Sequence, residues 1–168
     1  MVSNAPNSQS YDYKNILKEK NNKFLPQVCE SINSISGILR TTSKFSKFFY
    51  ILHLSGMLRI YNDSNYGGIT LFVPIDDRIG ISEKEMINMT AIEAIDIIKR
   101  HTVENIITYE LLLNSRSFFL DTKHPSKRLL IGSDGTNIVT LNYETVIIYG
   151  NINAENGIIH VIDSMIDS

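Results

Sequence analysis

The chain has 168 residues, a formal net charge of −2, and 43% hydrophobic and 20% charged residues. These values are typical of one soluble globular domain with a short extension. The slight negative charge, with no dense Lys/Arg cluster, argues against a nucleic-acid partner. The lone Cys29 excludes an internal disulfide and is interpreted as a small buried apolar residue. No run approaches the roughly 18 apolar residues of a membrane span, and residues 1–10 lack the features of a signal peptide.

The first 40 residues are predicted to form an N-terminal extension before a domain that covers residues 41–168. Residues 1–10 are polar and are expected to form a tail. Short helices are predicted between residues 11 and 40, where Pro26 suits a first turn and Gly37 a stop.

An amphipathic helix follows the extension. Apolar residues recur at i, i+3, i+4 and i+7, which predicts one core-facing stripe: Phe45, Phe48, Phe49 and Leu52. Residues 41–43 offer side chains that could cap its start, and Gly56 suits a left-handed C-terminal position. Residues 62–68 are then expected to form a polar loop.

Residues 70–75 are predicted to form a strand that is apolar on both faces and therefore central. Pro74 ends its hydrogen-bonded ladder because proline has no N–H to donate. Asp76 and Asp77 then lie at a turn. With no third acid or histidine beside them, they are interpreted as acceptors for backbone N–H groups rather than as an acid/base pair or a metal site.

Two capping boxes, at residues 82–85 and 90–93, predict two helices. In the second helix we expect Ala91, Ile95 and Ile98 on one buried stripe, with Ile92 beside them. A further helical turn is expected over residues 108–113.

The pattern then changes to strands at residues 118–120, 129–131, 136–141, 144–149 and 151–154, with a hairpin across residues 133–135. Helices thus dominate the first two-thirds and antiparallel strands the last third, and the early strand must pair with the late ones. This order predicts an α+β fold.

The last strand is apolar on both faces, so we expect it in the middle of the core. Asn156-Gly157 predicts a tight turn with both residues at positive φ. Beyond the turn, Ile158, His160 and Ile162 face one way, and Ile159 and Val161 the other. His160 is therefore interpreted as a packed, hydrogen-bonded histidine rather than a catalytic or metal-binding one.

Three ordered stretches resemble the landmarks of fasciclin-type adhesion domains. They are Thr70-Leu71-Phe72-Val73-Pro74-Ile75-Asp76, Arg100-His101 at a helix end, and Asn156-Gly157-Ile158-Ile159-His160-Val161-Ile162-Asp163. The resemblance covers about residues 43–166 and implies a wedge of antiparallel β-strands with helices packed along it. It also implies that the motif residues are structural: Thr70, Phe72, Pro74, Asp76, His101, Asn156, Gly157, His160 and Asp163.

The same resemblance implies a non-enzymatic role in adhesion or extracellular recognition, with a protein or matrix partner, no cofactor and no metal. Some family members present an Asp-Ile pair to integrins, and the aligned residues here are Asn151-Ile152. An amide cannot replace the charge that binds a cation, so an integrin contact by that route is not expected. Arg100 stands where the family has tyrosine. Asn151, Ile152 and Arg100 are the candidate partner-contact residues of an expected monomer.

Two other functions stay open. A carrier of a small hydrophobic ligand could use the Phe45/Phe48/Phe49 and Ile92/Ile95/Ile98 surfaces as a pocket between helix and sheet. A hydrolase is disfavoured because no catalytic motif is present, although a Ser/His/Asp trio could assemble from distant positions. Two triplets, Asn62-Asp63-Ser64 and Asn88-Met89-Thr90, fit the N-glycosylation pattern. The compartment stays open, because the family is usually secreted or on the cell surface while no leader is visible. The abundance of Ile, Asn and Lys raises the hypothesis of an AT-rich viral source.

Overall fold

A computed structural model describes residues 31–167, so the expectations for residues 1–30 lie outside the described residues. The helices of the described part are α2 (Ile35–Thr41), α3 (Ser46–Ser55), α4 (Leu58–Asn62), α5 (Glu83–Asn88), α6 (Ala91–Arg100) and α7 (Tyr109–Asn114). The strands are β1 (Ile69–Pro74), β2 (Thr102–Val103), β3 (Ser117–Asp121), β4 (Arg128–Ser133), β5 (Val139–Leu141), β6 (Thr145–Ala154) and β7 (Gly157–Ile162). None of these helices has the length and apolar character that crossing a bilayer requires.

The strands form one seven-stranded sheet in the order β2-β1-β7-β6-β5-β4-β3. The predicted pairing of the early strand with the last one is confirmed, with Thr70 opposite Ile158 and Phe72 opposite His160. This pair is parallel, whereas every other pair is antiparallel. The β6–β7 turn lies beside the start of β1, where Ile69 N–H donates to the carbonyl oxygen of Asn156 at 3.1 Å, so β7 must run in the same direction as β1. The α+β class is confirmed, with a mixed sheet.

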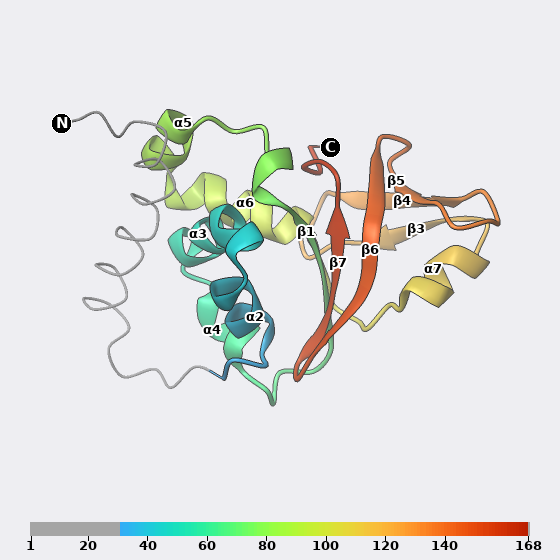
Figure 1. The fold of residues 1–168 in the computed structure, drawn as a ribbon, viewed down its shortest axis with the longest axis horizontal. Coiled ribbons are helices and arrows are strands. Elements are labelled where there is room, and N and C mark those ends of the chain that lie inside the picture. The colour runs from blue at the N-terminus through green and yellow to red at the C-terminus, as the bar shows by residue number, and fades with distance from the viewer. Residues whose placement is uncertain (1–30, 168) are drawn as a thin grey trace.

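The central strands lie between two layers, which explains why they are apolar on both faces (Figure 1). Helices α2 to α6 cover one side, and β3, β4, β5 and α7 lie on the other. Ile159 and Val161 of β7 belong to the core under the helices, while Ile162 belongs to the core that β4, β5 and α7 enclose. The predicted alternation of β7 is therefore confirmed.

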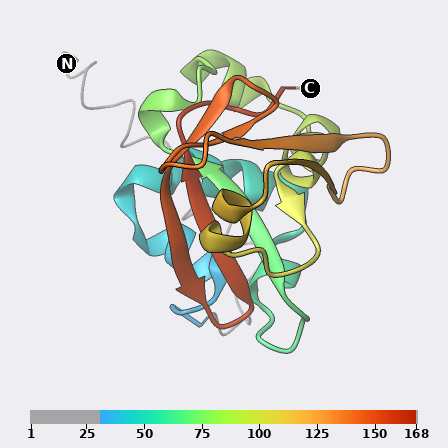
Figure 2. The same ribbon diagram turned by 90° about the vertical axis from the view of Figure 1, so that its right-hand side faces the viewer.

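The sheet curls strongly, so that its two edges approach each other at one end (Figure 2). Lys123, just after the edge strand β3, donates its backbone N–H to the carbonyl oxygen of Thr102 in the other edge strand, β2, at 2.8 Å. The fold is consequently close to a barrel.

Helix α3 carries the predicted aromatic stripe, and Phe45, Phe48, Phe49 and Leu52 are all buried. Gly56 has the predicted left-handed conformation, with φ 76°. The expected capping by residues 41–43 is wrong, because the helix start has no local side-chain cap. Asp76 supplies the cap from a distance: its two carboxylate oxygens accept from the Lys47 N–H at 2.8 Å and the Ser46 hydroxyl at 2.5 Å.

Two helical predictions need correction. The buried residues of α6 are Ala94, Ile97 and Ile98, an i, i+3, i+4 set, while Ile92 is 80% exposed. The predicted stripe of Ala91, Ile95 and Ile98 therefore lies partly on a neighbouring face, and only Ile98 of it is buried. Gly37 does not end a helix but lies inside α2, where a Cβ would overlap the carbonyl oxygen of Ser31. Close packing, not termination, requires glycine there.

The closing hairpin also differs from expectation. Ala154 pairs with Gly157, so the two-residue turn consists of Glu155 and Asn156, and neither they nor Gly157 has positive φ. Gly157 is required for another reason: a Cβ there would overlap the carbonyl oxygen of Ile69 in β1. The Asn-Gly pair thus serves packing against β1 rather than turn conformation. Helix α4 was not predicted. It occupies residues 58–62, just before the expected loop 62–68, and overlaps that loop only at Asn62.

Candidate functional site

His160 lies in the middle of β7 and is fully buried. Its Nε2 is 2.7 Å from the carbonyl oxygen of Ile107, and its Nδ1 accepts the backbone N–H of Asn151 at 3.1 Å. Because a backbone N–H can only donate, the ring proton sits on Nε2 and the imidazole is neutral. Burial lowers the pKa of His160, in opposition to its hydrogen bond with Ile107. Each ring nitrogen of His160 is therefore hydrogen-bonded to a backbone group.

Asn151 interrupts β6 directly above this histidine. It is one of the few non-glycine residues with positive φ, at 60°, in the described part of the chain. Its Oδ1 accepts the backbone N–H of Tyr109 at 2.9 Å, and its Nδ2 donates to both carboxylate oxygens of Glu110 at 2.9 and 3.0 Å. The pKa of Glu110 is lowered by its own backbone N–H and then by this amide. One amide thus joins β6 to the start of α7.

We call the region around this interruption the bulge surface, comprising Tyr109, Glu110, Tyr149, Gly150 and Asn151. The pairing of β6 with β7 shifts register here, on either side of Tyr149. Tyr149 is 64% exposed. The Tyr109 ring packs so closely on Gly150 that a Cβ there would lie 2.8 Å from it, and its hydroxyl donates to the carbonyl oxygen of Asn137 at 2.6 Å. The result is an exposed set of aromatic and acidic groups on a braced backbone.

Of the bulge surface, the sequence singled out Asn151 but missed Tyr109, Glu110 and Tyr149. The available signal was the break in the strand pattern at Gly150, because bulges are over-represented next to functional sites, where they re-aim a side chain. The candidate Ile152 is only partly exposed and packs against the helix-side core. Arg100 shares no described contact with Asn151.

The remaining motif residues connect elements inside the fold. Asn156 accepts the Ile35 N–H at 2.9 Å and donates to the carbonyl oxygen of Tyr61 at 2.8 Å, tying β7 to α2 and α4. Thr70 donates to the carbonyl oxygen of Asn105 at 2.5 Å and accepts the Ile107 N–H at 2.8 Å. Asp163 accepts the Val146 N–H at 2.9 Å. Phe72 and Pro74 are buried in β1, with the Phe72 ring 5.7 Å from that of His160.

His101 forms a second buried brace, at the end of α6. Its Nδ1 donates to the carbonyl oxygen of Ile97 at 2.7 Å, and its Nε2 accepts the Ile166 N–H at 3.0 Å. Burial lowers the pKa of His101 to about 4, so the ring stays neutral at physiological pH. Beside it, Arg100 donates from Nε to the carbonyl oxygen of Ile166 at 3.1 Å and pairs with Asp96. The Arg100 side chain is only 14% exposed and thus faces the C-terminal segment.

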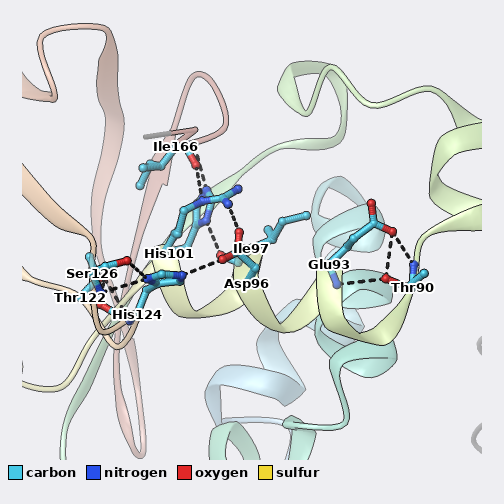
Figure 3. Close-up of polar contacts among 10 residues, drawn as sticks. Thr90, Glu93, Asp96, Ile97, His101, Thr122, His124, Ser126 and Ile166 are labelled. Carbon is cyan, nitrogen blue, oxygen red and sulfur yellow. Dashed lines mark hydrogen bonds and ion pairs between the residues drawn. The ribbon is translucent and has the colours of Figure 1, made fainter.

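Asp96 also belongs to a Ser–His–Asp trio assembled from distant positions, the arrangement that the sequence analysis did not exclude (Figure 3). Its Oδ1 is 2.7 Å from His124 Nε2, and His124 Nδ1 lies 3.3 Å from the Ser126 hydroxyl. The Ser126 backbone N–H also donates to Nδ1, at 3.2 Å, and so competes for the lone pair that would accept a proton from the hydroxyl. Asp96 is shared with Arg100. The trio is best described as a brace between the β3–β4 turn and α6.

Within residues 31–167, no three His, Cys, Asp or Glu side chains converge in an arrangement that could hold a metal ion. The electrostatics of the two histidine braces are likewise those of neutral, hydrogen-bonded rings.

Comparison with known proteins agrees with this architecture. The family model of the fasciclin domain matches residues 42–168. Among solved structures, a FAS1 domain pair from the insect cell adhesion molecule Fasciclin I is similar with a TM-score of 0.64 and 22% sequence identity. The similarity covers 81% of this chain and 51% of that one, so this chain spans about half the length of that domain pair. No curated protein sequence matches significantly. The family match extends over most of the chain, which therefore belongs to the fasciclin domain family.

Proposed function

We propose that this chain is a non-enzymatic recognition module that binds a protein or matrix partner through its bulge surface. The observation that carries the proposal is Tyr149, a large aromatic side chain left 64% exposed next to a backbone segment that the His160–Asn151 and Asn151–Tyr109 hydrogen bonds hold in place. Tyrosines are common anchors of protein interfaces, since they bury a large area while losing few rotamers. Adhesion-type modules are what the fasciclin fold is known for, which supports the same function.

The charge of the bulge surface indicates what a partner must supply. Glu110 is exposed, and the Asn151 amide holds both of its carboxylate oxygens in a fixed orientation. Hydrogen bonds from its own backbone N–H and from the Asn151 amide lower its pKa and so favour the ionised carboxylate. A partner with a lysine or arginine next to an apolar side chain would complement Glu110 and Tyr149. This chemistry differs from a contact in which the residue at 151 itself coordinates a cation.

Immobilised full-length chain should bind cells or purified matrix proteins, and Tyr149→Ser should weaken that binding at least about tenfold, the loss typical of an interface anchor. Tyr143→Ser is the matched control, because Tyr143 is 77% exposed but lies on the β5–β6 turn outside the bulge surface. Binding measured by cell adhesion and by biolayer interferometry should stay unchanged in this control. Equal binding by both variants and the parent, or no binding to any cell or matrix protein, would contradict the proposal.

The carrier hypothesis finds no comparable support in the described residues. Phe45, Phe48 and Phe49 are packed in the core, and Ile92 lies on the outside. Two hollows formed by the described residues, one of about 500 Å³ between α7 and the β4–β5 turn and one of about 250 Å³ beside Asp76, are lined mainly by polar residues. An apolar ligand would prefer an apolar cavity. Native mass spectrometry of the purified chain provides the direct check.

A further inference from the structure

The two Asn-x-Ser/Thr triplets lie in different surroundings. Asn62 ends α4, and its triplet continues through Asp63 to Ser64. Asn88 ends α5, and its triplet spans the connection to α6 through Met89 to Thr90. The sequence pattern treats the two asparagines alike, so only their environments can separate them.

The Asn62 side chain is engaged in the contact between α4 and α2. Its Oδ1 faces the hydroxyls of Ser34 and Ser36, at 3.2 and 3.4 Å, and both serines are fully buried. Ser34 is also the residue that caps α2 through the Gly37 N–H. A sugar attached to Nδ2 of Asn62 would have to leave the protein from beside this buried polar cluster. Native packing therefore opposes a glycan at this position.

Asn88 meets no such obstacle. It is exposed, and its side chain makes no hydrogen bond with the described residues. The hydroxyl of Thr90, two residues later, serves only the capping box of α6 with Glu93, at the surface. A glycan at Asn88 would extend into solvent without breaking a contact of the folded domain.

An apolar feature of this corner would also be covered by a glycan. Ile87, next to Asn88 in α5, is 50% exposed, and Ile92, four residues beyond Asn88 in α6, is 80% exposed. Two exposed isoleucines therefore flank this one triplet, and neither belongs to a core cluster of the described fold. The first sugars of a glycan on Asn88 lie within reach of such neighbours.

We infer that Asn88 is an N-glycan acceptor when the chain enters a secretory pathway, and that Asn62 stays unmodified. In the transfer, the Asn88 Nδ2 loses a proton and forms a bond to C1 of the first sugar. The bond from that C1 to the diphosphate of a lipid-linked oligosaccharide breaks, and the lipid diphosphate leaves. No oxidant or reductant is needed. A glycan on Asn88 would cover the α5–α6 corner and keep partners from binding there, while the bulge surface would stay accessible.

The test is translation of the full chain, with a cleavable leader added, in the presence of microsomes, followed by analysis of the protease-protected fraction. The expected result is one glycan, removed by a peptide-N-glycosidase, absent in Asn88→Gln and present in Asn62→Gln. Thr90→Ser, which keeps both the triplet and the helix cap, should retain it. Protected chain that carries no glycan, or that carries one on Asn62, would overturn the inference. Thermal melts of Asn88→Gln should match the parent, which separates loss of the acceptor from loss of folding.

Discussion

Replacing Asn156 by alanine should destabilise the domain far more than its position in a surface-looking turn suggests. Asn156 is only 2% exposed, and its amide satisfies the Ile35 N–H and the Tyr61 carbonyl oxygen. Truncation leaves both of these backbone groups buried without partners. An unsatisfied buried group costs about 1–3 kcal/mol, so the two together predict a loss of about 2–6 kcal/mol in the free energy of unfolding.

Urea denaturation followed by far-UV circular dichroism measures this loss. With a slope of about 2 kcal/mol per molar urea, the midpoint should fall by roughly 2 M. Asn153→Ala is the matched control, because Asn153 lies three residues earlier in β6, is exposed and makes no side-chain hydrogen bond with the described residues. The free energy of unfolding of this control should stay within about 0.5 kcal/mol of the parent's. Equal midpoints for the two variants would refute the view that the Asn156 amide holds α2 and α4 to β7.

Four further outcomes are expected. Burial lowers the folded-state pKa of His101 to about 4, below its unfolded value of about 6.5, so the unfolded chain binds more protons between these two pH values. About 3 kcal/mol of stability should therefore be lost as pH falls from 6.5 to 4. Urea midpoints measured across this range should depend less on pH in His101→Gln than in the parent. His160→Asp should destabilise by several kcal/mol by burying a charge, and an unchanged melting curve would show that position 160 is not buried. Asn151→Asp should lower the urea midpoint at pH 7, because two carboxylates then face each other, with partial recovery at pH 4 where one can be protonated; equal losses at both pH values would argue against the contact with Glu110. Gly150→Ala should cost about 1–3 kcal/mol by displacing the Tyr109 ring and should alter near-UV circular dichroism, which an open site would not do.

Features that depend on neighbours in the sequence were predictable. Both capping boxes form as expected, with Ser82 and Thr90 each accepting the N–H three residues on. Gly56 ends α3 in the left-handed conformation, and the apolar strands at residues 70–75 and 158–162 pair in the centre of the sheet. Each of these follows from local hydrogen bonding or from a period-2 apolar pattern.

Features that depend on distant parts of the chain were not predictable. The Asp76 carboxylate caps a helix that begins 30 residues earlier, and Gly157 is set by the approach of β1 rather than by its own turn. The buried face of α6 is selected by contact with α3, and several isoleucines allow more than one stripe. The bulge surface arises where β6 shifts register, which no local period encodes.

The parallel pairing of β1 with β7 sets a condition on how this molecule is made. On a ribosome, β1 emerges some ninety residues before the strand that must lie against it, so the middle of the sheet cannot be completed until β7 has left the exit tunnel. Contacts of such large separation slow folding and leave an unsatisfied strand edge exposed in the nascent chain. A stop codon placed before Asn156 would therefore yield a misassembled product open to chaperones and proteases, not a shortened working domain.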